Sequence, residues 1–193
     1  MIENDIQCDD PHLVETFHQF DKKKLLILGH GRHGKDTVAE LIAEKFGLTF
    51  NSSSRAALDA IWPALDVATE YKYYDKEEAF SDRSNCRELW KELITLYNTP
   101  DKASLCKLIL SQCDMYVGMR CDLEYEASRE LFDHVIWVDA SDRYPKEPSM
   151  KIKCDHQSMI WVDNNGTLDD LTNEVQYLEG IFEKWDPHSS YSV

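Results

Sequence analysis

A glycine-rich turn between an apolar tetrapeptide and an amphipathic segment constrains the fold of this chain more than any other feature. The run Leu25–Leu28 is wholly apolar, as in a strand that is buried on both faces. Residues 29–35 read Gly-His-Gly-Arg-His-Gly-Lys, and Lys35–Phe46 then places apolar residues at helical spacing before Gly47. The order of strand, glycine turn and helix predicts an α/β chain with a buried strand beneath the turn.

The turn fits the spacing G-x-x-x-x-G-K, which requires a strand before it and a helix after it. Glycines let successive backbone N–H groups point inward at phosphate oxygens, and the helix N-terminus adds partial positive charge. Lys35 adds a full charge beside the β- and γ-phosphates of a nucleotide. The residues expected to bind the phosphates of ATP are Gly29, His30, Gly31, Arg32, His33, Gly34, Lys35, Asp36 and Thr37.

Asp36 stands where the strict motif has serine or threonine, and Thr37 supplies a hydroxyl one place later. Gly-Lys-x-Thr resembles the loop of nucleoside monophosphate kinases of the adenylate kinase type, and Gly-Lys-Asp-Thr resembles that of bacteriophage deoxynucleoside monophosphate kinases. The resemblance spans residues 23–182. It implies ATP and Mg²⁺ as cofactors, with Thr37 at the Mg²⁺. Asp36 marks the subfamily, and whether it also binds Mg²⁺ through water stays open.

The rest of the chain alternates strands with helices, which favours a mainly parallel sheet. With the resemblance, this predicts a P-loop NTP hydrolase-type three-layer sandwich, with five strands flanked by helices. Further strands are expected at 48–51, 114–118, 134–139 and 159–162, and helices at about 82–97 and 168–182. The chain divides into an acidic leader with a short helix at 11–20, a kinase domain and a tail, at 1–20, 21–186 and 187–193. Within the domain, a helical acceptor-binding region and a lid-like loop are expected at about 52–112 and 140–151.

A kinase acting on a monophosphate needs a second phosphate site, and arginine suits it because its guanidinium binds phosphate bidentately. Arg120 follows a strand and resembles the family arginine that binds the acceptor phosphate, whereas Arg143 resembles the cations of the family's lid. The expected catalytic residues are Lys35, Arg120 and Arg143. The expected acceptor-binding residues are Ser53, Ser54, Arg55, Arg83, Arg87 and Arg120.

Structural roles stay open for these groups. Arg83 and Arg87 are expected four apart on one flank of the 82–97 helix, either over a cleft or paired with Glu78 or Glu88. The serines are also suited to capping the next helix, Arg120 to capping a strand end, and Arg143 to a solvated loop. The family's acidic residue before the glycine is Val117 here, which leaves three candidates for the carboxylate that organises Mg²⁺: Asp114, Asp122 and Asp139.

The turn after the last expected strand reads Asn-Asn-Gly-Thr and is similar to a segment of dephospho-CoA kinases and the phage kinases. The resemblance implies that Asn165 and Gly166 border the donor adenine; alone, the pattern indicates only a turn and a helix cap. His30 and His33 lie three residues apart on a curled loop, and we do not expect them to bind a metal.

Charge and composition limit the partners. The net charge of −15 argues against nucleic acid as a partner, and no apolar run approaches the roughly 20 residues of a membrane span. The acidic start lacks the features of a signal peptide, and the six cysteines show no C-x-x-C pair. We expect a cytoplasmic protein, in the host cytoplasm if viral, whose partners are small-molecule nucleotides. A homodimer is compatible with the sequence, which does not reveal the oligomeric state.

The favoured function is phosphoryl transfer from ATP to a (deoxy)nucleoside monophosphate, giving the diphosphate for DNA precursor synthesis. One alternative is a dephospho-CoA kinase-like enzyme. Its acceptor is a hydroxyl group, which needs a catalytic carboxylate, and this sequence lacks an Asp at the expected place beside the acceptor strand. Another is a non-catalytic nucleotide-binding protein. A nucleotide switch is disfavoured because it should keep Gly-Lys-Ser/Thr and a D-x-x-G. The base and sugar of the acceptor cannot be read from the sequence.

Overall fold

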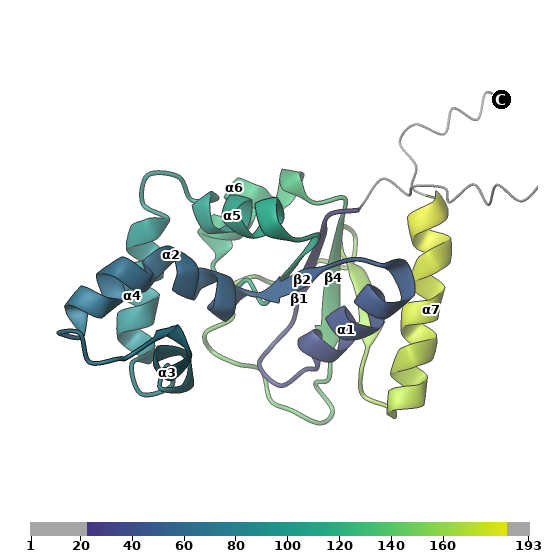
Figure 1. Ribbon diagram of the computed structural model, residues 1–193. Helices are drawn as coiled ribbons and strands as arrows, with labels where there is room; N and C mark the ends of the chain where they lie inside the picture. The colour runs from purple at the N-terminus through teal and green to yellow at the C-terminus, as the bar shows by residue number, and fades with distance from the viewer. Residues whose placement is uncertain (1–22, 185–193) are drawn as a thin grey trace, which may run out of the picture.

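The structure is a computed structural model that describes residues 23–184 (Figure 1). The leader with its expected helix and the tail from residue 187 lie outside the described residues. Five parallel strands form one sheet in the order β2-β3-β1-β4-β5. The strands are β1 (Leu25–Leu28), β2 (Phe50–Ser52), β3 (Met115–Val117), β4 (His134–Asp139) and β5 (Ile160–Asp163).

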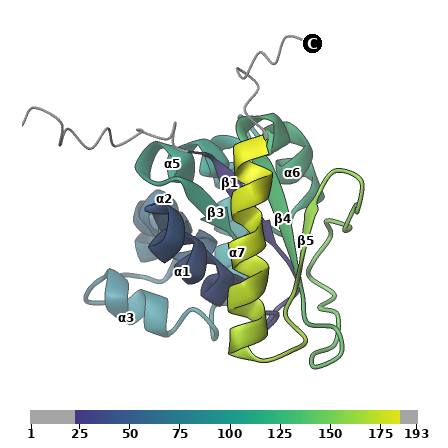
Figure 2. The same cartoon turned by 90° about the vertical axis from the view of Figure 1, so that its right-hand side faces the viewer.

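Helices cover both faces of the sheet because β1 alternates its side chains between two apolar layers. Leu25 and Ile27 pack with α1 (Lys35–Phe46) and α7 (Leu168–Lys184), which Figure 2 shows side by side on one face. Leu26 and Leu28 pack on the other face with α2 (Ser53–Ala68), α5 (Ser104–Gln112) and α6 (Asp122–Ser128), and the short helix η1 (Arg129–Leu131) follows α6. The expected three-layer sandwich with a five-stranded parallel sheet is confirmed.

A third apolar cluster, which we call the helical cluster, lies beside the sheet. It joins α2 to α3 (Lys76–Ser81) and α4 (Arg87–Tyr97), which extend away from the strands in Figure 1. Its buried residues are Leu58, Ile61, Leu65, Tyr73, Ala79 and Trp90. The sandwich and the helical cluster therefore have distinct apolar cores, which meet at Ala60 of α2 and at Ile94 and Tyr97 of α4.

The expected helix at 82–97 starts later than its apolar pattern indicated. Asp82 ends α3, since its N–H donates to the Glu78 carbonyl, and its carboxylate accepts the Asn85 amide at 2.5 Å. Residues 82–86 form turns, and the helix begins at Arg87. The prediction that Arg83 and Arg87 share one helix is therefore wrong, because a side-chain hydrogen bond competes with the helix at this point.

Within the described residues no helix combines the length and the apolar character needed to cross a membrane. The cysteines in this part of the chain are all free thiols: Cys86, Cys106, Cys113, Cys121 and Cys154.

Candidate active site

The glycine turn leaves β1 at the carboxyl edge of the sheet and enters α1, as its spacing predicted. Gly29 has φ of 145°, and a Cβ atom there would lie 2.5 Å from the Val138 carbonyl oxygen of β4. Gly34 has φ of 85°, and a Cβ there would collide with the side-chain amide of Asn164 beyond β5. The turn is thus wedged between two neighbouring strand ends, which requires glycine at both positions.

Lys35 lies over this turn. Its Nζ donates a hydrogen bond to the His30 carbonyl oxygen at 2.6 Å. Burial, followed by the charge of Arg120, lowers the pKa of Lys35. Asp36 is exposed in the first turn of α1 and Thr37 is half-buried behind it.

The two histidines of the glycine turn accept backbone hydrogen bonds from the segment that follows β4. His33 is fully buried, and its Nδ1 accepts the Ala140 N–H at 2.9 Å. His30 Nδ1 accepts the Glu147 N–H at 3.1 Å, and its ring lies edge-on to Trp137. In both rings Nδ1 serves as the acceptor of these bonds.

Segments from three strands meet at Lys35. A Cβ atom on Gly118, just after β3, would lie 3.4 Å from Ser53 Oγ and 3.7 Å from Lys35 Cε. Ser52, the residue before Ser53, caps α2: its side-chain oxygen accepts a hydrogen bond from the Arg55 N–H at 3.3 Å. Ser53 therefore faces the site while its neighbour performs the capping role.

Arg120 and Arg87 converge on one carboxylate. Arg120 Nη1 donates to Glu147 Oε1 at 2.5 Å and to Ser149 Oγ at 2.6 Å, and Arg87 Nη2 lies 3.2 Å from the same Oε1. Burial raises the pKa of Glu147, but the hydrogen bonds of Ser149 and Arg120 outweigh it and hold that pKa at about 2. Arg87 therefore pairs across the molecule rather than with Glu78 or Glu88.

Glu147 is the residue that the sequence reasoning missed. Its only signal is an acidic residue inside a loop that also carries Arg143 and Lys146. A Cβ on Gly31 would lie 2.5 Å from Glu147 Oε2, so the carboxylate rests directly against the glycine turn.

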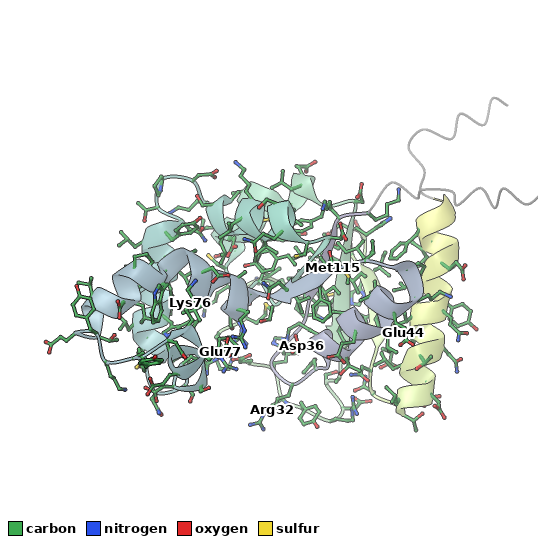
Figure 3. The ribbon with its side chains drawn as sticks, viewed as in Figure 1. Arg32, Asp36, Glu44, Lys76, Glu77 and Met115 are labelled. Carbon is green, nitrogen blue, oxygen red and sulfur yellow. The ribbon has the colours of Figure 1, made fainter. Side chains whose placement is uncertain are left out.

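Arg55 and Arg83 form a separate group in the helical cluster. Their Cζ atoms lie 4.0 Å and 4.1 Å from the centre of the Phe80 ring. Arg55 also bonds the Glu77 carboxylate, and Arg83 Nη1 donates to the Phe80 carbonyl at 2.9 Å. Figure 3 shows Glu77 on the side of the helical cluster that is turned toward Asp36 and α1. Of the expected acceptor arginines, the structure thus brings Arg87 and Arg120 together; no contact of Ser54 adds to either group.

Arg143 and the turn after β5 lie next to the glycine turn. Arg143 Nη2 bonds the Asn164 carbonyl, and the Asp142 N–H donates to Asn165 Oδ1 at 2.9 Å. The Asn164 amide donates to the His33 carbonyl at 2.9 Å, which links this turn to the glycine turn. A Cβ on Gly166 would lie 2.6 Å from the Asp170 carboxylate, so this glycine is needed by the cap of α7. The expected adenine-side residues are near the loop, and their contact with a base stays a prediction.

The three candidate magnesium carboxylates lie in different places. Asp114 precedes β3 at the opposite edge of the sheet, where it accepts hydrogen bonds from Thr49 and Lys24, so this candidate is wrong. Asp122 is exposed at the start of α6. Asp139 ends β4 and accepts the Ser141 hydroxyl at 2.8 Å; burial raises its pKa, but hydrogen bonds from Ser141 and Asn165 hold it low.

A magnesium ion at the carboxyl ends of the strands, beside the glycine turn, would have few protein ligands. The part of the chain that the structure describes holds no group of three or more His, Cys, Asp or Glu side chains suited to a metal. The oxygen donors of Thr37 and Asp36 are those that Mg²⁺ prefers, and Mg²⁺ is commonly held by one or two protein groups together with substrate phosphates.

Comparisons with known proteins give distant likenesses only. No protein-family model matches the chain, and no curated protein matches its sequence. One similar solved structure is that of TT1252 from Thermus thermophilus, at 13% identity and a TM-score of 0.49, covering 85% of this chain and 98% of that one. Another is a gluconokinase from Sinorhizobium meliloti 1021, at 14% identity and a TM-score of 0.44, covering 86% and 98%. Neither likeness bears on function, which rests on the residues of this chain.

Proposed function

We propose that this protein transfers a phosphoryl group from ATP to a (deoxy)nucleoside monophosphate, in a step that supplies DNA precursors. The observation that carries the proposal is the meeting of Lys35 with Arg120 and Arg87 at one place. Lys35 Cε and Ser53 both approach Gly118, while Arg120 and Arg87 share the Glu147 carboxylate that rests on the glycine turn. A donor phosphate and an acceptor phosphate would thus have cations on both sides.

The chain's own groups can perform the transfer by positioning and charge. The N–H groups of the glycine turn and Lys35 would hold the transferring phosphate, and Arg120 with Arg87 would orient the acceptor phosphate and offset its charge. Mg²⁺, when bound near Thr37 and Asp36, supplies further neutralisation of the phosphates. An acceptor phosphate oxygen is already an anion, so the reaction needs no general base.

A hydroxyl acceptor, as in a dephospho-CoA kinase-like enzyme, is the less supported alternative. Such an acceptor needs a carboxylate that takes up its proton. Glu147 is paired with two arginines and has a pKa of about 2, which makes it a poor base at neutral pH. Asp139 is held by Ser141 and Asn165. These contacts favour a phosphate acceptor, and the arginines opposite Lys35 favour catalysis over nucleotide binding alone.

The proposal is tested by product formation from ATP and Mg²⁺ with a panel of acceptors: each ribo- and deoxynucleoside monophosphate, dephospho-CoA and no acceptor. We expect diphosphate from one or more of the monophosphates. Lys35→Ala should lower kcat/KM at least about 100-fold, because it removes a charge that stabilises the transferring phosphate. Its circular dichroism spectrum should match that of the unaltered protein.

Lys45→Ala is the matched control, because Lys45 lies at the far end of the same helix and pairs with Glu179. It should keep activity within about twofold, the effect of an exposed ion pair being small. Normal turnover by Lys35→Ala would refute the assignment of the loop. Product from dephospho-CoA alone would replace the monophosphate with a hydroxyl acceptor.

A further inference from the structure

The segment from Ala140 to Glu147 is fastened onto the glycine turn at both ends. His33 Nδ1 accepts the Ala140 N–H at 2.9 Å, and His30 Nδ1 accepts the Glu147 N–H at 3.1 Å. Beyond it, the Lys151 N–H donates to the Arg120 carbonyl at 3.0 Å. The backbone around Glu147 is therefore held in place independently of what its side chain does.

The Glu147 side chain reaches from this segment into the group of cations. Its Oε1 accepts from Arg120 at 2.5 Å and from Arg87 at 3.2 Å. Its Oε2 lies 2.5 Å from the place a Cβ would take on Gly31, at the surface of the phosphate loop. Its charge also acts on Lys35, favouring the charged form of that amine. One carboxylate thus lies within the influence of three cations.

The cations need an anion at this place. Burial, and after it the positive charge of Arg120, lowers the pKa of Lys35, so the two cations lie close enough to repel one another. A carboxylate and a phosphate both offer oxygens that match the guanidinium fork. The position of Glu147 is therefore chemically suited to a phosphate group.

We propose that Glu147 is an internal competitor for phosphate: its carboxylate occupies the anion position between Arg87, Arg120 and the glycine turn, and an incoming phosphate group must displace it. The identity of that phosphate as part of a nucleotide rests on the proposed function, whereas the displacement concerns anion binding alone. The state in which Glu147 occupies the site cannot bind the phosphate. The apparent association constant for phosphate is therefore the intrinsic constant multiplied by the fraction of molecules in which Glu147 is displaced.

The inference is tested by calorimetric binding of inorganic pyrophosphate, without metal, to the full chain. Glu147→Gln removes the charge but keeps the length of the side chain and the backbone N–H that His30 accepts. We expect it to bind pyrophosphate about tenfold more tightly than the unaltered protein. Glu147→Asp, which keeps the charge but shortens the reach to the arginines, should give a smaller gain in affinity and serves as a second variant.

Asp142→Asn is the matched control. It removes the same charge from the same segment, and Asp142 is exposed and contacts Asn165 through its backbone only. Its affinity for pyrophosphate should change less than twofold. Adding Arg120→Ala to Glu147→Gln should abolish the gain, because the gain comes from a guanidinium made available.

Two results would overturn the inference. One is a Glu147→Gln protein that binds pyrophosphate no better than the unaltered protein, and the other is a gain of equal size in Asp142→Asn. The outcome of this binding experiment is independent of the outcome of the kinase assay. Tighter pyrophosphate binding with no turnover of any acceptor would support the internal competitor and contradict the kinase, while turnover without tighter binding would do the reverse.

Discussion

Glu124 has its carboxyl group in the core, on α6, behind the strand that leads to Arg120. The Tyr116 hydroxyl donates to Glu124 Oε1 at 2.9 Å, and the side chain is almost wholly buried. Burial raises the pKa of Glu124 to about 7, and the Tyr116 hydrogen bond opposes it only in part. Below about pH 7 the folded protein therefore prefers the protonated acid.

This preference predicts that stability falls as the pH rises. The stabilisation from protonated Glu124 is complete below the ordinary pKa of 4.5 and is lost as the pH rises through about 7. The shift corresponds to at most about 3 kcal/mol of unfolding free energy. Glu124→Gln cannot ionise, so it should gain up to this amount relative to the unaltered protein between pH 5 and pH 8.

Urea unfolding at pH 5 and pH 8 measures this effect. Glu126→Gln is the control, because Glu126 is exposed on the same helix. It should follow the pH dependence of the unaltered protein. Parallel pH profiles for Glu124→Gln and the unaltered protein would show that folding does not raise the pKa of Glu124.

Single residues differ in how far the sequence could predict them. Lys35 and Arg120 follow buried strands in parallel order, so their meeting at one edge was predictable. Asp114 was misplaced because it precedes its strand by one residue, which puts it at the opposite edge. Glu147 was missed because a loop has no period, and only the fold shows that it reaches Arg87, which is 60 residues away in the chain.

At the scale of elements, the two glycines that flank α1 have similar backbones and different surroundings. Gly34 precedes the helix with φ of 85°, and Gly47 follows it with φ of 65°. A Cβ on Gly34 would meet the Asn164 amide, whereas nothing lies within 4 Å of a Cβ on Gly47. Alanine at either position adds about 1 kcal/mol of left-handed strain.

Gly34→Ala should therefore lower stability and ATP affinity by more than its backbone strain alone predicts. Asn164 must move, which breaks its hydrogen bond to the His33 carbonyl and separates the turn after β5 from the glycine turn. We expect ATP binding to weaken at least about tenfold in calorimetry, with an added loss of about 1 kcal/mol in stability from the broken bond. Gly47→Ala should lose only the stability that corresponds to the backbone strain, and it should bind ATP normally. Equal ATP affinity in the two variants would contradict the role of this wedge.

Regular elements were predicted well where an apolar period runs unbroken. The strands at Leu25–Leu28 and His134–Asp139 and the helix Lys35–Phe46 have the expected bounds. The second strand lies at Phe50–Ser52 instead of 48–51, since a three-residue strand at the sheet edge gives little pattern to read. The connections of the helical cluster depend on side-chain bonds such as Asp82 to Asn85, which periodicity does not record.

At the scale of the whole molecule, the sandwich and the helical cluster can respond separately to mutation. Trp90 is a buried anchor of the helical cluster, and its ring lies 6.3 Å from that of Phe80. Phe80 in turn lies against Arg55 and Arg83. The order of this group therefore depends on Trp90, while the sheet that positions Lys35 and Gly118 has its own core.

Trp90→Ala should loosen the helical cluster and leave the sheet intact. Removing a buried tryptophan costs about 3–5 kcal/mol where it packs. Hydrogen exchange should accelerate in α2, α3 and α4 and stay slow in β1, β3 and β4. If the acceptor binds between the sandwich and the helical cluster, the KM for the acceptor should rise while the affinity for ATP stays within about twofold.

Trp161→Ala is the control for this experiment, because Trp161 lies on β5 at 40% exposure and stacks on His156, outside the helical cluster. It should leave exchange in α2–α4 unchanged. Faster exchange in β1, β3 and β4 of Trp90→Ala would mean that the two cores unfold as one unit. The helical cluster would then belong to the same cooperative unit as the sheet.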